Sequence, residues 1–533
     1  MNKYKLVIIS LFIIFNTSFF SCTKNISKSY DKIPILDEIT INDIRSGYEN
    51  KKFSVKDIVS RYLENIKTID ESGPELNSII TINPDALNIA DSLDNILQLG
   101  KPIGPLFGVP VLLKDNINTH DKMPTTGGSR ILRNSYPTHD SWVAEKLRQA
   151  GAVILGKTNL SEWANYRASF SSSGWSGLGG QTKNPYVLDR NPCGSSSGSA
   201  VAVSANLCAV AIGTETWGSI MCPSNANGIV GIKPTVGLWS RSGIIPISYT
   251  QDTAGPMTRT VEDAAILLGV ATGIDMNDKK TIKSKNKYLE DYTKYLNPNG
   301  LEGKRIGYVK TVEGKNHRVD ILIKKALNDL RKNGAEIIEI DNIFQKIENK
   351  NSAEEYAIEI MAHEFKDGLK KYFQALGPSA TVSDLGDVIK QTQLDSIEML
   401  YFNLDRMKNS ESKNDLKSKE YNESLIEMKS LTRDLGMDRV MKKYNLDAFV
   451  SPTGSPAWKT DLINGDKYYI STTVFAALSG YPNINVPMGF IDHVPVGISF
   501  YGAEWSEPTL IEIAYAYEQK TKHRKKPKYF ITD

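Results

Sequence analysis

Residues 191–220, "NPCGSSSGSAVAVSANLCAVAIGTETWGSI", decide how the rest of this chain is interpreted. The stretch is rich in glycine, serine and alanine, a composition found in flexible linkers and in backbone packed closely around a reaction centre. A linker would not contain apolar runs typical of core strands, yet AVAIG lies at 209–213 and GIVGIKP at 228–234. We therefore predict that the stretch is packed inside the fold, where glycine permits close approach of the backbone.

The segments on either side alternate between helix and strand patterns. The capping box SVKD at 54–57 predicts the start of a helix, and further helices are expected at 141–150 and 319–332. Short apolar strands are expected at 76–82, 109–113, 151–156 and 335–340. This alternation predicts an α/β fold in which a sheet lies between layers of helices. The charged segment 405–429 is poor in strand formers, and we expect a helical excursion on the surface there.

The charge balance excludes one broad class of function. The chain has 533 residues with 64 Lys and Arg against 61 Asp and Glu, so its formal net charge is only +3. A protein that binds nucleic acid over a large surface carries a far stronger basic excess, so no nucleic-acid partner is expected. The run KTKHRKKPK at 520–528 is basic, and we interpret it, with the 526–533 tail, as a solvated end of the chain.

The first 34 residues are not expected to belong to the folded domain. Lys3 and Lys5 precede the apolar run 6–15, a pattern typical of a secretory signal and too short for a comfortable bilayer span. The segment closes with Ser21 and Cys22, which resembles a bacterial lipoprotein signal. In that interpretation residues 1–21 are the signal, Cys22 is lipidated, 22–34 is a polar tether, and the protein is a membrane-anchored lipoprotein of the bacterial cell envelope. A plain signal peptide with an incidental cysteine is the alternative.

The remaining cysteines and the histidines do not form a recognisable metal or disulfide pattern. Cys193, Cys208 and Cys222 are odd in number and contain no C-x-x-C pair, so neither a disulfide framework nor a zinc site is expected. A cysteine nucleophile at Cys193 or Cys222 would need a histidine, and none lies near in sequence. HEFKD, beginning at His363, lacks the second histidine of a zinc motif, so we interpret it as a helix-surface pair. No metal or cofactor is expected.

Several blocks along the chain resemble the amidase signature family of serine hydrolases, in the order that the family shows. The resemblance covers roughly residues 35–525, which would form one domain with a variable helical region at about 340–440. It implies the amidase signature fold, a central mixed β-sheet covered by helices on both faces in three α/β/α layers. The matching blocks are 108–115 (GVPVLLKD), 150–159 (AGAVILGKTN), 193–199 (CGSSSGS), 213–223 (GTETWGSIMCP), 231–235 (GIKPT), 252–259 (DTAGPMTR), 447–453 (DAFVSPT) and 480–482 (GYP).

The resemblance implies a Ser–Ser–Lys triad that contains no histidine. Carried over residue by residue, the nucleophile is Ser219, the bridging serine on a cis peptide is Ser195, and the base is Lys114. A free lysine has a pKa near 10.4, so only about one molecule in 2,500 is neutral at pH 7. Burial lowers that pKa by up to ~3 units and makes a lysine base feasible. A surface lysine after a strand is the alternative, but the run VPVLL before Lys114 favours burial.

The loop before the nucleophile is the expected oxyanion hole. Its donors would be the backbone N–H groups of Thr216, Trp217, Gly218 and Ser219. Many family members have Gly or Asp at the position of Trp217, whose side chain does not easily allow φ > 0. We expect Trp217 to line the acyl side of the site and favour apolar acyl groups; the alternative is that its ring points into the core and supports the loop.

Further blocks look most like the peptide amidase branch, which releases ammonia from C-terminal peptide amides. These blocks are 172–176 (SSGWS), 179–185 (GGQTKNP) and 243–252 (GIIPISYTQD). The expected partners are a small-molecule or peptide amide substrate and, through the lipid anchor, a membrane; a monomer is expected. One alternative is the amidotransferase subunit that releases ammonia from glutamine. Another is an inert amidase-fold binding lipoprotein, suggested only by Trp217.

Overall fold

The computed structural model describes residues 37–100, 104–348 and 350–532. The expected signal peptide, the lipidation residue Cys22 and the tether lie outside these residues. Residues 37–532 fall in a single compact unit. Within the described ranges, we find no helix with the length and apolar character needed to span a bilayer.

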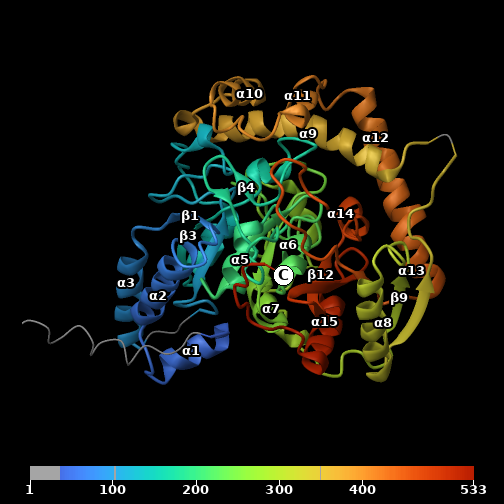
Figure 1. Cartoon of the computed structure of the whole chain (residues 1–533), viewed down its shortest axis with the longest axis horizontal. Helices are drawn as coiled ribbons and strands as arrows, with labels where there is room; N and C mark the ends of the chain where they lie inside the picture. The colour runs from blue at the N-terminus through green and yellow to red at the C-terminus, as the bar shows by residue number, and fades with distance from the viewer. Residues whose placement is uncertain (1–36, 101–103, 349, 533) are drawn as a thin grey trace, which may run out of the picture. The chain divides into compact units, whose positions relative to one another are not determined.

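A mixed sheet of eleven strands forms the centre of the fold, in the order β1-β3-β2-β6-β8-β7-β12-β13-β11-β9-β10 (Figure 1). Strands β2, β3 and β6 are parallel neighbours, whereas β6, β8, β7, β12, β13 and β11 pair antiparallel in turn. The strands are β1 (Ile79–Ile82), β2 (Pro110–Lys114), β3 (Val153–Thr158), β6 (Val210–Glu215), β7 (Val230–Lys233), β8 (Thr253–Thr258), β9 (Arg305–Val309), β10 (Glu336–Ile340), β11 (Ala448–Pro452), β12 (Asn483–Ile491) and β13 (Val494–Tyr501), with β4 (Trp175–Ser176) and β5 (Gly180–Gln181) forming a separate pair.

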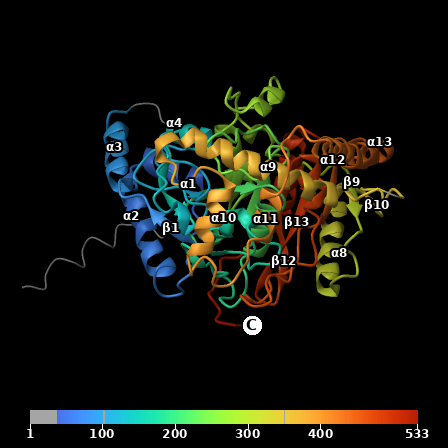
Figure 2. The ribbon, with the colours of Figure 1, turned by 90° about the horizontal axis from the view of Figure 1, so that it is seen from above.

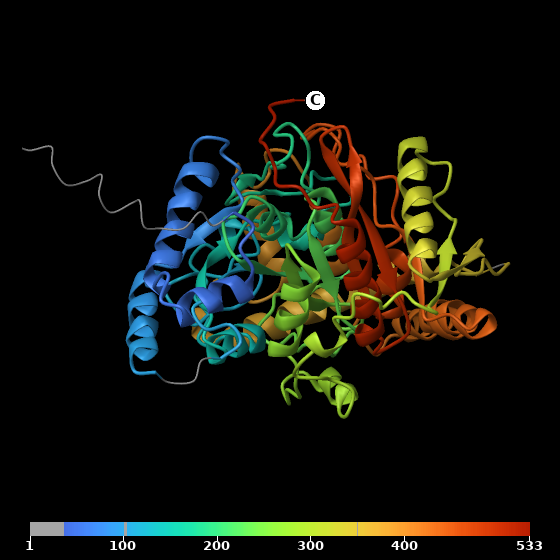
Figure 3. The same cartoon turned by 90° about the horizontal axis from the view of Figure 1, so that it is seen from below.

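Helices flank the sheet, which confirms the amidase signature fold expected from the sequence. Short α5 and α6 contact each other and the central strands, and α7, α8 and α15 form a second group that also packs on the sheet (Figure 3). The helices are α1 (Ile41–Glu49), α2 (Val55–Asn65), α3 (Ala86–Gln98), α4 (Trp142–Gln149), α5 (Ser197–Ser204), α6 (Met221–Ala226), α7 (Val261–Val270), α8 (His317–Lys332), α9 (Ala353–Leu376), α10 (Leu385–Leu394), α11 (Asp405–Glu411), α12 (Lys419–Lys429), α13 (Asp438–Tyr444), α14 (Val474–Ser479) and α15 (Glu507–Thr521).

The glycine- and serine-rich stretch is buried in the core, as its apolar runs predicted. Every residue of α5 is buried, including its serines. A Cβ on Gly198 would lie 2.1 Å from the carbonyl oxygen of Ser78 and 2.5 Å from that of Asn159. Only glycine therefore lets α5 approach the backbone beside β1 and β3 this closely. The composition reflects close packing and not a linker.

Helices α9 to α12 lie together outside the sheet and form a layer of their own (Figures 1 and 2). The long helix α9 starts at a capping box made by Ser352 and Glu355, and it packs against α11 and α12. Helices α11 and α12 occupy most of the charged segment 405–429, where a helical excursion was expected.

The expectation that His363 and Glu364 form a surface pair is wrong. Both residues lie on α9 and both are only 1% exposed. Glu364 accepts hydrogen bonds from the hydroxyls of Ser248, Thr250 and Tyr421. At this point α11, α12 and the 248–250 loop cover α9. The two polar residues therefore hold neighbouring segments together, although their sequence resembles that of a surface pair.

Candidate active site

Lys114 is the last residue of β2, and its ammonium group is completely buried. Its Nζ lies 2.7 Å from Ser195 Oγ and 2.8 Å from Thr214 Oγ1, with the carbonyl oxygen of Thr214 at 3.2 Å. The Nδ2 group of Asn116 donates to the same Thr214 hydroxyl at 3.0 Å. The lysine is therefore held in one position by groups from β6 and from the loop that precedes α5.

Burial lowers the pKa of Lys114 to about 7, because the charged form loses its hydration. The negative charges of Asp252 and Glu215 oppose this shift and favour the protonated form. A lysine whose pKa is near 7 exists as both base and acid at neutral pH, which suits a group that must accept a proton and later return it. The surface alternative for Lys114 is therefore excluded by its position.

Ser195 lies between Lys114 and the second serine loop. The Gly194–Ser195 peptide is cis, the conformation that the resemblance implied. The carbonyl oxygen of Ser195 accepts a hydrogen bond from the Ser161 N–H at 3.1 Å, and its hydroxyl contacts Lys114. Helix α5 begins two residues later and fixes the direction in which this loop leaves the site.

Ser219 lies in the loop between β6 and α6 and is 8% exposed. Gly218 before it has φ +82°, a conformation that favours glycine. The Ser196 N–H donates to the Ser219 carbonyl oxygen at 3.1 Å, so the two serine loops are adjacent. No hydrogen bond joins the Ser195 and Ser219 hydroxyls among the residues that the structure describes. The fold thus brings the Lys114–Ser195 pair into contact and places Ser219 on the neighbouring loop.

The expected oxyanion loop, Thr216 to Ser219, is fixed at both ends by carboxylates. One oxygen of Glu215 accepts from the N–H groups of Ile220 and Met221 at 2.8 and 3.0 Å, which caps the start of α6. At the other end, the Thr216 hydroxyl donates to Asp252. Within the described ranges, the N–H groups of Trp217, Gly218 and Ser219 donate to no other group, so they remain available to an oxyanion.

Trp217 is not among the residues that line the cavity described below, and neither Ser195 nor Ser219 is, so the expected place of Trp217 on the acyl side of the site stays a prediction. Its ring is half-buried and packs against two apolar clusters. The first contains Trp163, Tyr166 and Phe365, and the second contains residues of α12 and α14. These contacts favour the alternative, in which the ring supports the oxyanion loop.

The expectation that the chain has no disulfide is wrong. Cys193 and Cys222 form a disulfide with their Cα atoms 5.9 Å apart, and Cys208 is a buried free thiol. The two half-cystines are 29 residues apart in sequence and meet because the two serine loops are adjacent in space. The spacing alone gave no signal of this, since the pairing depends on how β6 returns beside α5.

A cavity of about 630 Å³ adjoins the surroundings of Lys114, although Lys114, Ser195 and Ser219 are not among its lining residues. Its wall includes Asn116 and Thr214, which hold the lysine, and Thr216 of the oxyanion loop. Loop 244–249 forms another side, and Gly368, Lys371 and Tyr372 of α9 form the outer side. A cavity of this size falls in the range of small-molecule and peptide sites.

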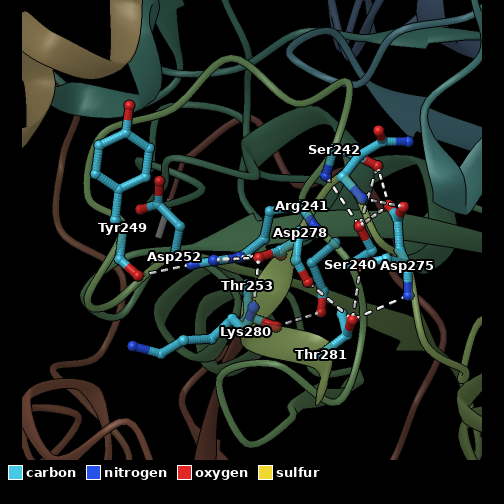
Figure 4. A network of polar contacts seen from close by, with 12 residues as sticks. Ser240, Arg241, Ser242, Tyr249, Asp252, Thr253, Asp275, Asp278, Lys280 and Thr281 are labelled. Carbon is cyan, nitrogen blue, oxygen red and sulfur yellow. Dashed lines mark hydrogen bonds and ion pairs between the residues drawn. The ribbon is translucent and has the colours of Figure 1, made fainter. Parts of the chain in front are cut away.

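A polar network stabilises one wall of this cavity (Figure 4). The Arg241 guanidinium donates to both oxygens of Asp278, at 2.6 and 2.7 Å, and to the Tyr249 carbonyl oxygen at 2.8 Å. Bidentate pairs of this kind are geometrically specific. The Tyr249 hydroxyl then donates to Asp367 of α9 at 3.1 Å. The network therefore connects the cavity loop to the helical layer.

One group in the described part of the chain has the geometry to hold a metal ion, and it lies away from the serines. Glu359, His363 and Glu420 converge between α9 and α12. Lys413 already provides a cation there, because its Nζ donates to Glu359 at 2.7 Å. His363 Nδ1 lies 3.0 Å from the Asn414 carbonyl oxygen, and its Nε2 lies 2.9 Å from Glu359. We interpret the cluster as a structural network in which the Lys413 ammonium balances the negative charge of Glu359.

Comparison with known proteins identifies relatives over almost the whole chain. The family model described as "Amidase" matches residues 57–511. The native peptide amidase from Stenotrophomonas maltophilia is 43% identical, with a TM-score of 0.88 over 92% of this chain and 99% of that one. An amidase family protein from Bacillus anthracis is 34% identical, with a TM-score of 0.83 over 92% and 93% of the two chains. A glutamyl-tRNA(Gln) amidotransferase subunit of Rippkaea orientalis is 34% identical over 92% of this chain and 99% of its own length.

Proposed function

This chain belongs to the amidase family and hydrolyses amide C–N bonds, and we propose that it does so with a Ser219–Ser195–Lys114 triad. The observation that carries the proposal is the buried Lys114 with its Nζ 2.7 Å from Ser195 Oγ. A buried lysine that contacts a serine hydroxyl and has its pKa lowered to about 7 can act as a general base. No histidine is required.

The proton path runs from the nucleophile to the lysine. Neutral Lys114 accepts the Ser195 proton while Ser195 accepts the proton of Ser219, whose oxygen attacks the amide carbonyl carbon. Hydrogen bonds of a catalytic relay are often long without substrate and shorten in the substrate complex, so the Ser195–Ser219 contact forms at that stage. The protonated lysine then returns its proton through Ser195 to the amide nitrogen, because an amine leaves readily only when it is protonated.

The oxyanion loop stabilises the charge that develops on the carbonyl oxygen. The unengaged N–H groups of Trp217, Gly218 and Ser219 are the proposed donors, together with Thr216. Loss of one such donor typically lowers the rate by about 10²–10³-fold. Departure of the amine leaves an acyl ester on Ser219, and a water molecule activated by the same relay hydrolyses it.

The proposed substrates are peptides that end in a carboxamide, with ammonia as the leaving group. Two observations support this class: the 43% identity to the S. maltophilia peptide amidase over 92% of this chain, and the cavity of about 630 Å³ whose wall includes Thr214, a hydrogen-bond partner of the lysine. The test is ammonia release by the purified protein from a dipeptide amide, a fatty amide and an aryl amide. The proposal predicts the highest kcat/KM for the dipeptide amide. Equal or greater kcat/KM for either other amide would contradict it.

Glutamine hydrolysis is the second candidate, favoured by the amidotransferase relative at 34% identity. An enzyme of that kind would release ammonia from free glutamine at least as well as from a dipeptide amide. The same ammonia assay with glutamine separates the two functions. We expect glutamine to be a poor substrate, because its amide is at the end of a side chain next to a charged α-amino acid group.

We further propose that the protein is exported and anchored to the cell envelope through Cys22. The lipoprotein-type pattern at residues 1–22 supports this proposal, as does the Cys193–Cys222 disulfide, since disulfides persist mainly outside the reducing cytoplasm. Cys22→Ser should release the protein from the membrane fraction and remove the lipid mass from its N-terminal peptide. Unchanged membrane association with no lipid on Cys22 would overturn the anchor.

A further inference from the structure

The Cys193–Cys222 disulfide joins the two loops that carry the serines. Cys193 lies two residues before Ser195, and Cys222 lies three residues after Ser219. Both half-cystines are buried, at 4% and 3% exposure. The cross-link therefore connects the backbone segments on which the relative positions of the two hydroxyls depend, and it does so inside the core.

Hydrogen bonds connect Cys222 to the backbone directly before Ser219, and Cys193 to the first residue of α5. The Cys222 N–H donates to the carbonyl oxygen of Gly218, the residue directly before Ser219, at 2.8 Å. On the other loop, the Cys193 carbonyl oxygen accepts from the Ser197 hydroxyl at 2.6 Å. A displacement of either half-cystine would be transmitted to the neighbouring serine within one or two residues.

Besides the disulfide, hydrogen bonds of Ser196 join the two segments. The Ser196 N–H donates to the Ser219 carbonyl oxygen at 3.1 Å, and the Ser196 hydroxyl donates to the Thr214 carbonyl oxygen and accepts from the Thr214 N–H. These bonds hold the backbone at Ser196, whereas the disulfide is the covalent link between the loops. Two sulfur atoms must move apart once they are thiols, because non-bonded atoms cannot approach as closely as covalently bonded ones. The surrounding core is closely packed and cannot absorb this movement without shifting a loop.

We propose that this disulfide is a positioning element for the Ser195–Ser219 pair, and that amide hydrolysis by Ser219 requires the oxidised chain; the inference rests on the triad proposed above. Reduction takes two electrons and two protons, which a dithiol supplies as it closes its own disulfide, and yields the Cys193 and Cys222 thiols. A misplacement of about 1 Å at a reacting group can lower a rate about 10²-fold. The loss should appear in kcat and not in KM, because the cavity wall contains neither cysteine.

The test compares three forms of the full chain: the oxidised wild type, the wild type reduced with dithiothreitol, and the Cys193→Ala/Cys222→Ala variant. For each we would measure kcat and KM on a dipeptide amide and the rate at which a fluorophosphonate labels Ser219. A thiol count by mass spectrometry after alkylation verifies the redox state, and circular dichroism verifies the fold. Cys208→Ala is the matched control, since it removes the buried thiol that forms no disulfide.

The expected result is a fall of about 10–100-fold in kcat and in labelling rate for both the reduced chain and the double variant, with KM changed less than about threefold. Reoxidation should restore the wild type, the double variant should not respond to dithiothreitol, and Cys208→Ala should behave as the wild type. If the reductant does not reach the disulfide, the kcat of the double variant tests the proposal. If the double variant does not fold, the kcat of the reduced wild type tests it.

Two outcomes overturn the inference. One is a folded chain with two additional free thiols that keeps its kcat within twofold; the other is a folded double variant that does so. Failure of the proposed triad gives a different result, because hydrolysis by the oxidised wild type would then persist in Ser219→Ala. The disulfide inference fails only where a Ser219-dependent activity survives loss of the cross-link.

Discussion

The serine loops at 191–222 and the helical layer at 353–429 differ in nearly every physical respect. The loops are built from small residues, are almost wholly buried and are held by strands, helix starts and a disulfide. The helical layer is rich in charge, exposes much of its surface and contributes Gly368, Lys371 and Tyr372 to the outer wall of the cavity.

This difference separates two tasks. Bond cleavage depends on groups that must hold their positions within a fraction of an ångström, which a densely packed core provides. Recognition of the acyl part of a substrate tolerates looser positioning and can be assigned to an outer layer. We therefore expect substitutions in the loops to change kcat for every amide, and substitutions in the helical layer to change which amides are accepted.

The largest expected effect comes from the proposed nucleophile, Ser219. Ser219→Ala should lower kcat/KM for a dipeptide amide by about 10⁴-fold or more, because covalent catalysis is lost. Ser224→Ala is the matched control: it removes another buried serine five residues along the chain, in α6. Ammonia release measures both. If Ser219→Ala kept more than a hundredth of the wild-type rate, Ser219 would not be the nucleophile and the loop would not have the chemical role given to it.

The relay should give the next largest effect. Lys114→Ala and Ser195→Ala are each expected to lower kcat by about 10²–10⁴-fold, the usual contribution of general acid–base catalysis. Lys157→Met is the matched control for the lysine, because Lys157 is a second buried lysine whose pKa is lowered by desolvation to about 8. That variant should lose stability and keep the wild-type dependence of rate on pH. Near-normal kcat in Ser195→Ala would exclude a relay through the second serine.

The pH dependence should reflect the same lysine. Since the pKa of Lys114 is about 7 and its neutral form is the proposed base, kcat/KM should rise with pH through about pH 7 and level off at higher pH. Asp252 favours the protonated lysine, so Asp252→Asn should move this rise to lower pH. A rise in the variant at unchanged or higher pH would show that another group controls the rate.

The smallest effect is expected where the two regions meet. Trp217→Ala should lower the free energy of unfolding by about 1–3 kcal/mol, which is less than the loss expected for a fully buried tryptophan. It should also slow the hydrolysis of all amides to the same extent. We would measure thermal unfolding together with kcat/KM for a bulky and a small acyl amide. A large change in the ratio of these two values would favour the pocket-wall role of the ring and place recognition partly in the loop.

The two regions also differ in how far the sequence alone could predict them. The serine loops and Lys114 are identifiable because the blocks 193–199, 213–223 and 108–115 resemble those of the amidase signature family. The apolar run before Lys114 predicts its burial. The resulting burial and the 2.7 Å contact between Lys114 and Ser195 agree with that expectation. The Ser–Ser hydroxyl contact remains a prediction.

Features that depend on the approach of distant segments could not be predicted. The Cys193–Cys222 disulfide, the Asp252 carboxylate beside Thr216 and the burial of His363 all depend on segments that are far apart in sequence or covered by other elements. The cavity is likewise assembled from β6, the 241–253 loop, residues 277–279 and α9. The sequence of a long helix does not reveal whether a polar residue lies on an exposed face or on a face that another helix covers.

Fluorophosphonate labelling tests the central claim, a serine nucleophile activated by a buried lysine, most directly. The oxidised wild type and Lys114→Ala would be labelled at several pH values, and the adduct would be located by peptide mapping. The expected result is a single adduct on Ser219, a labelling rate that rises with pH through about pH 7 and levels off at higher pH, and a much slower, pH-insensitive rate in Lys114→Ala. An adduct on another residue, or a Lys114→Ala variant labelled as fast as the wild type, would contradict it.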